Sequence, residues 1–228
     1  SREDARKQIV SDLKDINHLI KEEDYIHKVG YSERGNVPIE YYLSEQWFLK
    51  MEDLAKPAIS AVRNKEINFY PNHWVKTYNH WMDNIQDWCI SRQLYWGHQI
   101  PVWYKKDADR TNQDNWFVST TPPTDLENWE QDPDVLDTWF SSWLWPFAVH
   151  GWPDIKTTKY FPTNALVTGP DIIFFWVARM IMSGYEFMGD LPFKDVYFTS
   201  ILRDDKGRKL SKSLGNSPDP ITLFEKYG

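Results

Sequence analysis

The 228 residues include 33 acidic and 26 basic side chains, for a formal net charge of −7, and 41% of them are hydrophobic. This composition is typical of an ordinary globular domain, and the acidity excludes a chain that coats nucleic acid with uniform positive charge. A single cysteine, Cys89, excludes an internal disulfide and a multi-cysteine zinc site. Because no apolar run is long enough to span a bilayer, we expect no membrane association and a cytoplasmic protein.

The first part of the chain differs in pattern from the rest. Apolar residues at helical spacing predict an amphipathic helix over residues 1–20, and a polar, turn-rich stretch follows over 24–45. A new pattern begins near residue 46, so we divide the chain into a small α+β segment, 1–45, and a main domain, 46–228. Both ends of the chain lie in or beside helical patterns, and we therefore expect a piece of a longer protein.

The middle of the chain mixes helices with short strands. We predict a helix at 50–64 bent at Pro57, a helix at 72–87, a strand at 99–104, a mostly irregular stretch over 105–134 with one strand at 116–118, and a short aromatic helix from Asp137 through Trp145.

Residues 165–201 have the pattern of a βαβ unit. An apolar strand is predicted over 165–168, a helix over 172–188 after the segment Gly169-Pro170-Asp171, and a second strand over 196–201. Two strands joined in this way run parallel with a right-handed crossover. The sequence thus predicts the α/β fold class, in which ligands bind beyond the carboxyl ends of the strands.

The polar loop after the second strand, residues 203–216, suits a polyphosphate. Lys209 and Lys212 supply positive charge, while Ser211, Ser213 and backbone N–H groups can donate to phosphate oxygens. Composition alone favours a solvated basic loop, but the order Lys-Leu-Ser-Lys-Ser after a βαβ unit reverses that preference.

The loop after the first strand is predicted at the same sheet edge. Asp171 is in a position typical of a helix cap. Alternatively, its carboxylate accepts from a ribose hydroxyl while Gly169 allows close approach. Spacing alone leaves the two interpretations equal, and the shared edge favours nucleotide binding.

Three large apolar residues near these loops are candidates for a pocket wall. Trp139, Ile172 and Trp176 are core residues by ordinary preference, but Ile172 and Trp176 share a helix face next to Asp171. Arg92 lies where a helix gives way to a strand, and it either anchors that junction or contacts a nucleic-acid phosphate. The histidines form no ligand set, so we predict no protein-bound metal.

Four segments in the same order resemble the class I aminoacyl-tRNA synthetases, and specifically their valine-specific branch. They are an ISRQ-type block at 88–104, a DTWFSS block at 132–147, the segment VTGPDIIFFWVARM at 167–180, and KLSKS at 209–213, which resembles the KMSKS signature with Leu210 in place of Met. The forms GHQIP, DTWFSS and DIIFFW separate the valine branch from its isoleucine and leucine relatives.

This resemblance implies the second half of a Rossmann-like catalytic domain that activates L-valine with ATP and Mg²⁺ and transfers it to tRNA(Val). It implies a catalytic role for Lys209 and Lys212, ATP contacts for Gly169, Asp171, Lys209, Ser211, Lys212 and Ser213, a valine pocket of Trp139, Ile172 and Trp176, and tRNA contact for Arg92. It also implies that 1–45 is the tail of an editing insertion with its return linker.

One family signature, His-x-Gly-His, is missing. The segment Tyr95-Trp96-Gly97-His98 has tyrosine where the first histidine belongs, so we expect the true motif upstream and an isolated piece that is nearly inactive. The cysteine-rich zinc element that some relatives carry also has no counterpart near 31–36. Two alternatives stay open: a noncatalytic nucleotide- or tRNA-binding paralogue that lacks the first half-domain, and an enzyme for isoleucine.

Overall fold

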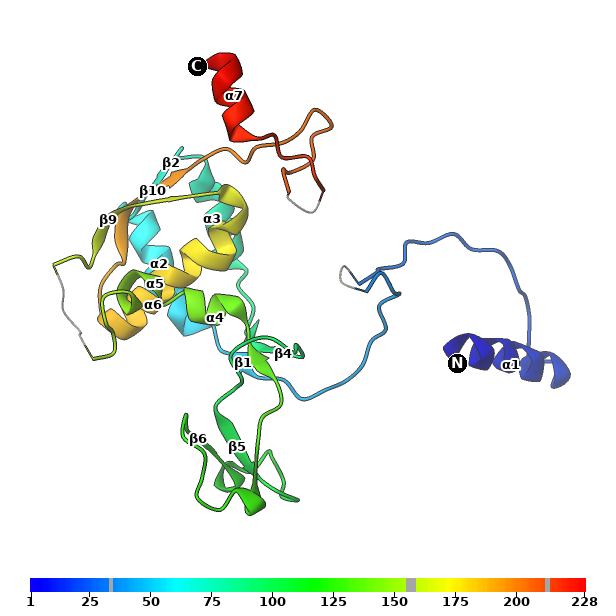
Figure 1. Cartoon of the computed structure of the whole chain (residues 1–228). Helices are drawn as coiled ribbons and strands as arrows, with labels where there is room; N and C mark the ends of the chain where they lie inside the picture. Colours follow the sequence, from blue (N-terminus) through cyan, green and yellow to red (C-terminus); the bar gives the residue numbers. More distant parts are fainter. Residues whose placement is uncertain (33–34, 155–158, 212–213) are drawn as a thin grey trace. The chain divides into compact units, whose positions relative to one another are not determined.

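The computed structural model describes residues 1–32, 35–154, 159–211 and 214–228. The chain divides into two units, residues 1–45 and residues 46–228, and each is described by itself (Figure 1). Across the described ranges, no helix combines the length and the apolar character that crossing a membrane requires.

In the described part of the first unit the one helix is α1 (Arg2–Asp15), and an isolated antiparallel bridge joins Tyr31 and Pro38 farther along. The helix begins with a capping box, in which Asp4 N donates to Ser1 Oγ at 3.2 Å and Ser1 N donates to the Asp4 carboxylate at 3.1 Å. None of its residues is buried. The helix predicted over 1–20 is right in kind but too long, because Asn17 adopts a left-handed conformation with φ of 56°.

A three-stranded parallel sheet organises the second unit. Its strands are β2 (Asn68–Tyr70), β9 (Thr163–Thr168) and β10 (Phe193–Phe198), in the order β2-β10-β9. β9 and β10 run parallel, which confirms the pairing expected of the βαβ unit. Sequence patterns do not predict β2, because three residues are too few to carry a period and the strand is defined by its pairing with β10.

Between β9 and β10 the chain is helical from Pro170 to Met188 but changes its winding. It passes from η3 (Pro170–Ile172, a 3₁₀ turn) through η4 (Ile173–Ala178, a π-helix) and α6 (Arg179–Ser183) to η5 (Gly184–Met188, a second π-helix). The helix predicted over 172–188 is confirmed in extent. A π-helix bonds residue i to i+5, so residues four apart do not align as they do in an α-helix. Ile172 and Trp176, which were expected to lie on one helix face, are therefore not aligned as the prediction assumed.

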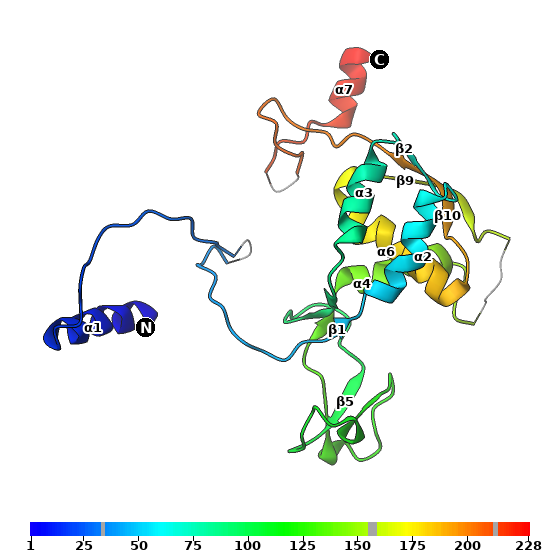
Figure 2. The ribbon, with the colours of Figure 1, turned by 180° about the vertical axis from the view of Figure 1, so that it is seen from behind.

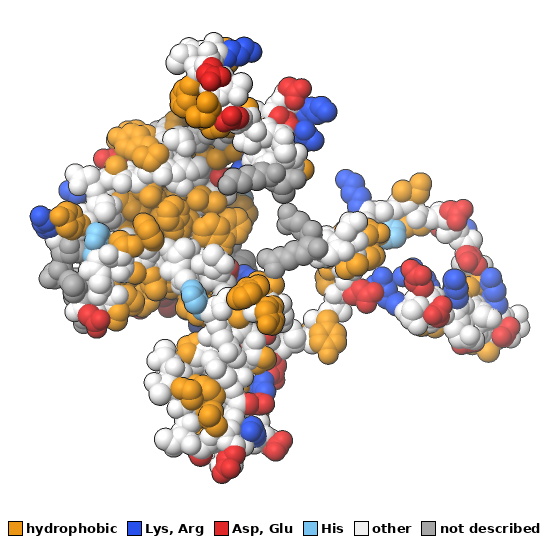
Figure 3. All heavy atoms as spheres, in the orientation of Figure 1, with side chains coloured by type: hydrophobic (Ala, Val, Ile, Leu, Met, Phe, Trp, Pro, Cys, Tyr) orange, Lys and Arg blue, Asp and Glu red, His pale blue; other side chains and the backbone are white. Residues whose placement is uncertain are grey.

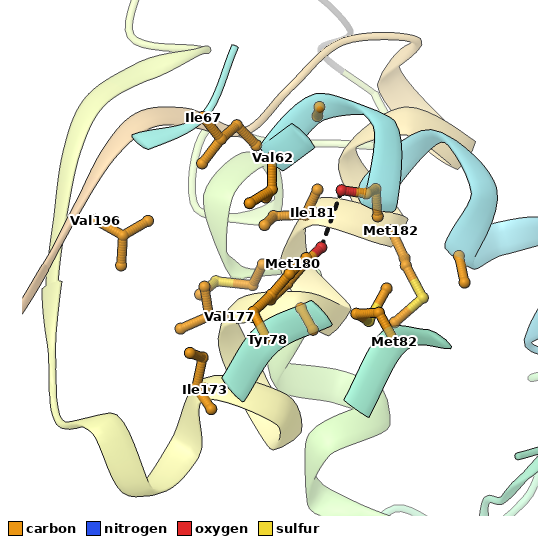
Figure 4. Packing of buried hydrophobic residues seen from close by; sticks show 14 of the residues in the cluster. Val62, Ile67, Tyr78, Met82, Ile173, Val177, Met180, Ile181, Met182 and Val196 are labelled. Carbon is orange, nitrogen blue, oxygen red and sulfur yellow. Dashed lines mark hydrogen bonds between the residues drawn. The ribbon is translucent and has the colours of Figure 1, made fainter. Parts of the chain in front are cut away.

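Three helices build the core with this sheet. α2 (Glu52–Arg63), α3 (Trp74–Asp83) and α6 contribute to one buried apolar cluster with β2 and β10, and the reverse view in Figure 2 shows the three helices grouped beside the strands. Figure 4 shows the members of this cluster at close range, including Val62, Ile67, Tyr78, Met82, Ile173, Val177, Met180, Ile181, Met182 and Val196.

Tyr78 is buried in this core, and its hydroxyl group has a hydrogen-bond partner. Its hydroxyl donates to Ala58 O at 3.0 Å, and burial raises the pKa of the phenol above its ordinary value. Pro57 lies inside α2, as predicted. The helix predicted over 72–87 ends at Asp83, because the chain must reach an extended segment at residue 88.

Short antiparallel strands form the remaining sheets of the described chain. β1 (Phe48–Leu49) pairs with β3 (Trp88–Cys89), β4 (Ser91–Arg92) pairs with β8 (Val135–Leu136), and β5 (Val102–Lys105) lies between β6 (Trp116–Val118) and β7 (Trp129–Gln131). The strand predicted at 116–118 is confirmed. β7 and the 3₁₀ turns η1 (Gln113–Asn115) and η2 (Leu126–Asn128) lie in the stretch that was expected to be mostly irregular.

The aromatic helix expected from Asp137 through Trp145 is split in two. Asp137 caps α4 (Thr138–Ser142), as predicted, and α5 (Trp145–Ala148) follows as a separate turn. Pro146 lies at the start of α5, where a residue without an N–H group is tolerated, and it favours a new helix start over a continuous helix. The last element is α7 (Pro220–Tyr227).

Candidate functional site

The carboxyl ends of β9 and β10 bring two distant loops together. Phe198 pairs with Thr168 at the ends of the two strands, and the next residue, Thr199, donates its N–H to Thr168 O at 2.9 Å. The loops that begin at Gly169 and Thr199 therefore leave the sheet side by side, as parallel topology requires.

Asp171 and Lys209 meet across this edge. Lys209 Nζ donates to Asp171 Oδ2 at 2.7 Å, although the two residues are 38 positions apart in the chain. Both side chains remain largely exposed, so the pair is a surface ion pair of modest energy that solvent can reach. Asp171 also lies in the first turn of η3, where a negative charge suits the helix N-terminus. Sequence reasoning thus selected two groups that the fold places in direct contact.

Gly169 stands at a point where a side chain does not fit. A Cβ atom added there would lie 2.7 Å from Ile201 Cδ1 and 2.8 Å from Asp171 Oδ1. The backbone is extended, with φ of −80°, so the constraint is close approach and not a glycine-specific conformation. Gly169 therefore lets the Asp171 carboxylate lie against the loop.

The loop after β10 begins as a small hairpin. Arg203 and Lys209 form an antiparallel bridge, and Leu210 N donates to Leu202 O at 3.2 Å. At the tip, Gly207 N donates to Asp204 O at 2.9 Å, with Gly207 at a positive φ of 74°. This turn reverses the chain and directs Lys209 back toward the sheet edge.

Asp204 holds this hairpin together. Its side chain is only 9% exposed, and its carboxylate accepts from Lys206 N at 3.0 Å, Arg208 N at 2.8 Å and Arg208 Nε at 2.8 Å. Asn216 Nδ2 donates to the same carboxylate at 2.9 Å, and this hydrogen bond is the main cause that lowers the pKa of Asp204. One carboxylate thus connects the tip of the hairpin to the far end of the loop.

Asn216 extends the connection into the motif. Its Oδ1 accepts from Ser211 N at 2.8 Å, and its Nδ2 also donates to Lys209 O at 3.3 Å. We call Asp204 and Asn216 together the loop clamp. Sequence reasoning missed both members, although an Asp three residues before the turn glycine was a usable signal. Lys212 and Ser213 lie outside the described residues.

Trp139 and Trp176 lie on neighbouring elements. The Trp176 indole N–H donates to Ser142 O at 3.0 Å, and the Trp139 ring stacks on Phe175 with centroids 5.9 Å apart. Both tryptophans are half-buried against the core, and Figure 3 shows hydrophobic side chains gathered over α4 and the adjacent helix. Ile172 is half-buried at the end of η3, outside the π-helical turn that carries Trp176.

Arg92 is bound within the protein. Its Nη1 donates to Cys89 O at 2.7 Å and Ser91 O at 2.8 Å, and its Nη2 lies 3.0 Å from Asp137 Oδ2. These contacts favour the interpretation that Arg92 anchors the junction, because a nucleic-acid phosphate would compete with all of them.

The described residues contain no group of three His, Cys, Asp or Glu side chains placed to hold a metal ion.

A family model described as tRNA synthetases class I (I, L, M and V) matches residues 5–228. The chain belongs to this family. Among curated relatives, the valine–tRNA ligases of Chlorobaculum tepidum and Bacillus subtilis are 58% and 54% identical to it over its whole length. The chain spans 26% of each of these class I synthetases. The resemblance to the valine branch is thereby confirmed.

Solved structures of class I synthetases share the fold. Mycobacterium tuberculosis methionyl-tRNA synthetase in complex with methionyl-adenylate has a TM-score of 0.59 at 20% identity, over 87% of this chain and 34% of that one. Its apo form has a TM-score of 0.56 at 16% identity, over 89% and 34%. These similarities confirm the predicted α/β, Rossmann-like fold class of this synthetase chain.

Proposed function

We propose that this chain is the part of a valine–tRNA ligase that holds one side of the site for ATP, with Mg²⁺, and for L-valine. In that reaction an oxygen of the valine carboxylate bonds to the α-phosphorus of ATP. The bond from that phosphorus to the β-phosphate oxygen breaks, which gives valyl-adenylate and pyrophosphate. The valyl group then passes to the 3′ end of tRNA(Val).

The two loops at the sheet edge have complementary roles in this proposal. Lys209, with Lys212, offsets the negative charge of the phosphates as it develops, which is often the largest catalytic contribution. Ser211 and Ser213 donate to phosphate oxygens. Asp171 accepts from a ribose hydroxyl, and Gly169, which has no Cβ to displace this carboxylate, lets it keep its position.

The apolar residues give the site its preference for an aliphatic side chain. Trp139 and Trp176 are held near each other by the Ser142 and Phe175 contacts, and with Ile172 they offer a wall of apolar rings and aliphatic surface in which the Trp176 N–H is already bonded to Ser142 O. A valine side chain suits such a wall because it has no group that needs a hydrogen bond.

The observation that carries the proposal is the contact of Lys209 with Asp171. Two residues predicted as nucleotide-binding groups on separate loops lie 2.7 Å apart at the carboxyl ends of parallel strands. In the structure each of the two side chains pairs with the charge of the other. ATP binding then exchanges partners: Lys209 moves to phosphate, and Asp171 becomes free for the ribose.

Two assignments outside this site complete the proposal. We infer that residues 1–45 are the end of an editing insertion with its return linker. The protein works in the cytoplasm, where a reducing environment suits its one free thiol, Cys89.

Valine-dependent ATP–pyrophosphate exchange by the full-length protein tests the proposal. We expect exchange with valine but not isoleucine, and Lys209→Gln should lower kcat/KM about a hundredfold, as loss of a charge-stabilising group does. Lys206→Gln, which removes a lysine from the same hairpin, should retain activity. ATP binding without any exchange would instead support a noncatalytic binder.

A further inference from the structure

A buried carboxylate fixes the start of the helix that carries Trp139. Asp137 is 7% exposed, and its Oδ1 accepts from Trp139 N at 3.4 Å as the cap of α4. Its Oδ2 accepts from the Trp88 indole N–H at 2.8 Å and lies 3.0 Å from Arg92 Nη2. The position of Trp139 therefore depends on where this carboxylate is held.

Arg179 approaches the same carboxylate from the helix that carries Trp176. It is 5% exposed, its Nη1 lies 3.8 Å from Asp137 Oδ2, and its guanidinium lies 3.5 Å from the centre of the Trp88 ring. Burial lowers the pKa of Arg179 to about 10, so the group stays protonated at neutral pH. Among the described residues, its Nε and Nη1 have no hydrogen-bond partner.

A contribution to stability does not explain the buried ion pair of Asp137 and Arg179. Replacing a buried ion pair with apolar side chains of similar volume is often neutral or stabilising, and unpaired buried donors cost free energy. A role in positioning the two helical elements explains why the charged Arg179 is buried between them. Three more contacts join the same two elements: Trp176 Nε1 to Ser142 O at 3.0 Å, Ser183 Oγ to Trp143 O at 2.6 Å, and the stacked rings of Trp139 and Phe175.

We propose that Asp137 and Arg179 form a tether that sets the spacing between α4 and the helix of residues 173–183, and with it the width of the apolar site between Trp139 and Trp176. Both are positioning residues, since they act through the two tryptophans. The choice of valine as the ligand rests on the proposed function, whereas the tether is a property of the fold.

Arg179→Met in the full-length protein is the sharpest test. Methionine fills a similar volume, removes the unpaired donors, and leaves Asp137 paired with Arg92 and Trp88. We expect the KM for valine in pyrophosphate exchange to rise about tenfold or more, because small misplacements of binding groups are costly, while the KM for ATP and the Tm stay nearly unchanged. An unchanged KM for valine, or equal rises in both KM values with a lower Tm, would overturn the tether.

Amide hydrogen exchange separates the tether from the choice of amino acid. In Arg179→Met, faster exchange should be confined to residues 138–142 and 173–178 and absent from the β6-β5-β7 sheet, whatever amino acid the enzyme uses. Unchanged exchange in those two segments would overturn the tether, whereas loss of valine dependence in the wild type would refute only the proposed function.

The exposed pair of Arg63 and Asp83, which also joins two helices, supplies the control. Arg63→Gln should change neither the KM for valine nor the exchange of residues 138–142. If Arg179→Met does not fold, Arg179→Lys, which keeps the charge but not the planar contact with Trp88, tests the same expectation in a milder form.

Discussion

Gly169 separates β9 from the Asp171 carboxylate at a point with no room for a Cβ atom. Nothing in its backbone conformation requires glycine, so the requirement comes from neighbouring atoms. One of these atoms is the end of a flexible isoleucine side chain, and the other is the carboxylate oxygen itself. An added methyl group therefore acts mainly on the position of Asp171.

We expect Gly169→Ala to weaken nucleotide binding more than it weakens the fold. Displacing the carboxylate should raise the KM for ATP about tenfold, since binding groups tolerate little misplacement, and leave the KM for valine nearly unchanged. Pyrophosphate exchange at varied ATP and valine concentrations measures both. Gly30→Ala, where the added Cβ would make only an ordinary contact at 3.4 Å, is the control. A normal KM for ATP in Gly169→Ala contradicts the close-approach argument.

At the scale of one element, the loop clamp gives the 203–216 loop a defined shape. Asp204 gathers four donors at one carboxylate, and Asn216 links it to the backbone of Lys209 and Ser211. Since these bonds lower the pKa of Asp204 in the folded protein, the stabilisation is fully present above the ordinary carboxyl pKa. It is lost as the pH falls through the lowered value, so the clamp is intact at neutral pH.

Removal of the clamp should expose the loop to proteolysis. The loop offers trypsin several lysines and arginines, and Asn216→Ala removes the bonds to Asp204, Lys209 and Ser211 at once. We expect cleavage within 203–212 to accelerate about tenfold, because losing these bonds shifts the local opening equilibrium by on the order of 1 kcal/mol. Mass spectrometry of limited digests locates the cut. Asn64→Ala, at an exposed turn, should digest at the wild-type rate.

At the scale of the whole molecule, the two faces of the parallel sheet differ. Val196 and Phe69, which are register partners, lie buried under the helices. On the opposite face Tyr70, Tyr197 and Val167 form one row across the three strands, and each is more than 40% exposed. Parallel sheets are almost always covered on both faces. The chain is about a quarter of its relatives in length, so we expect another part of the full-length protein to cover this row.

Tyr197→Lys distinguishes a covered row from an exposed one. In the full-length protein the charge should be buried at a cost of about 2 kcal/mol or more, which appears as a lower Tm. In the 228-residue chain alone the substitution should be nearly neutral. Thermal unfolding of both forms, with Thr121→Lys in an exposed turn as the control, measures the difference. Equal shifts in the two forms would show that the row stays exposed.

The features that the sequence predicted are those whose signal lies within one short segment of the chain. The β9–helix–β10 unit has long apolar segments with a clear period, and from it the shared sheet edge and the proximity of Gly169, Asp171 and Lys209 could be expected. β2 and β7 are three residues each and are defined by distant pairing. The π-helical turns, the loop clamp and the burial of Arg179 depend on contacts between residues far apart, which no periodic pattern records.

The contact between Lys209 and Asp171 also bears on ionic strength. Salt weakens an exposed ion pair by screening it, and it weakens a lysine–phosphate contact in the same way. If Lys209 leaves one anion as it meets the other, the number of ion pairs it makes is conserved when the nucleotide binds. The contribution of Lys209 to the salt dependence of nucleotide binding then largely cancels. The site can therefore select for phosphate without becoming strongly sensitive to the surrounding ionic strength.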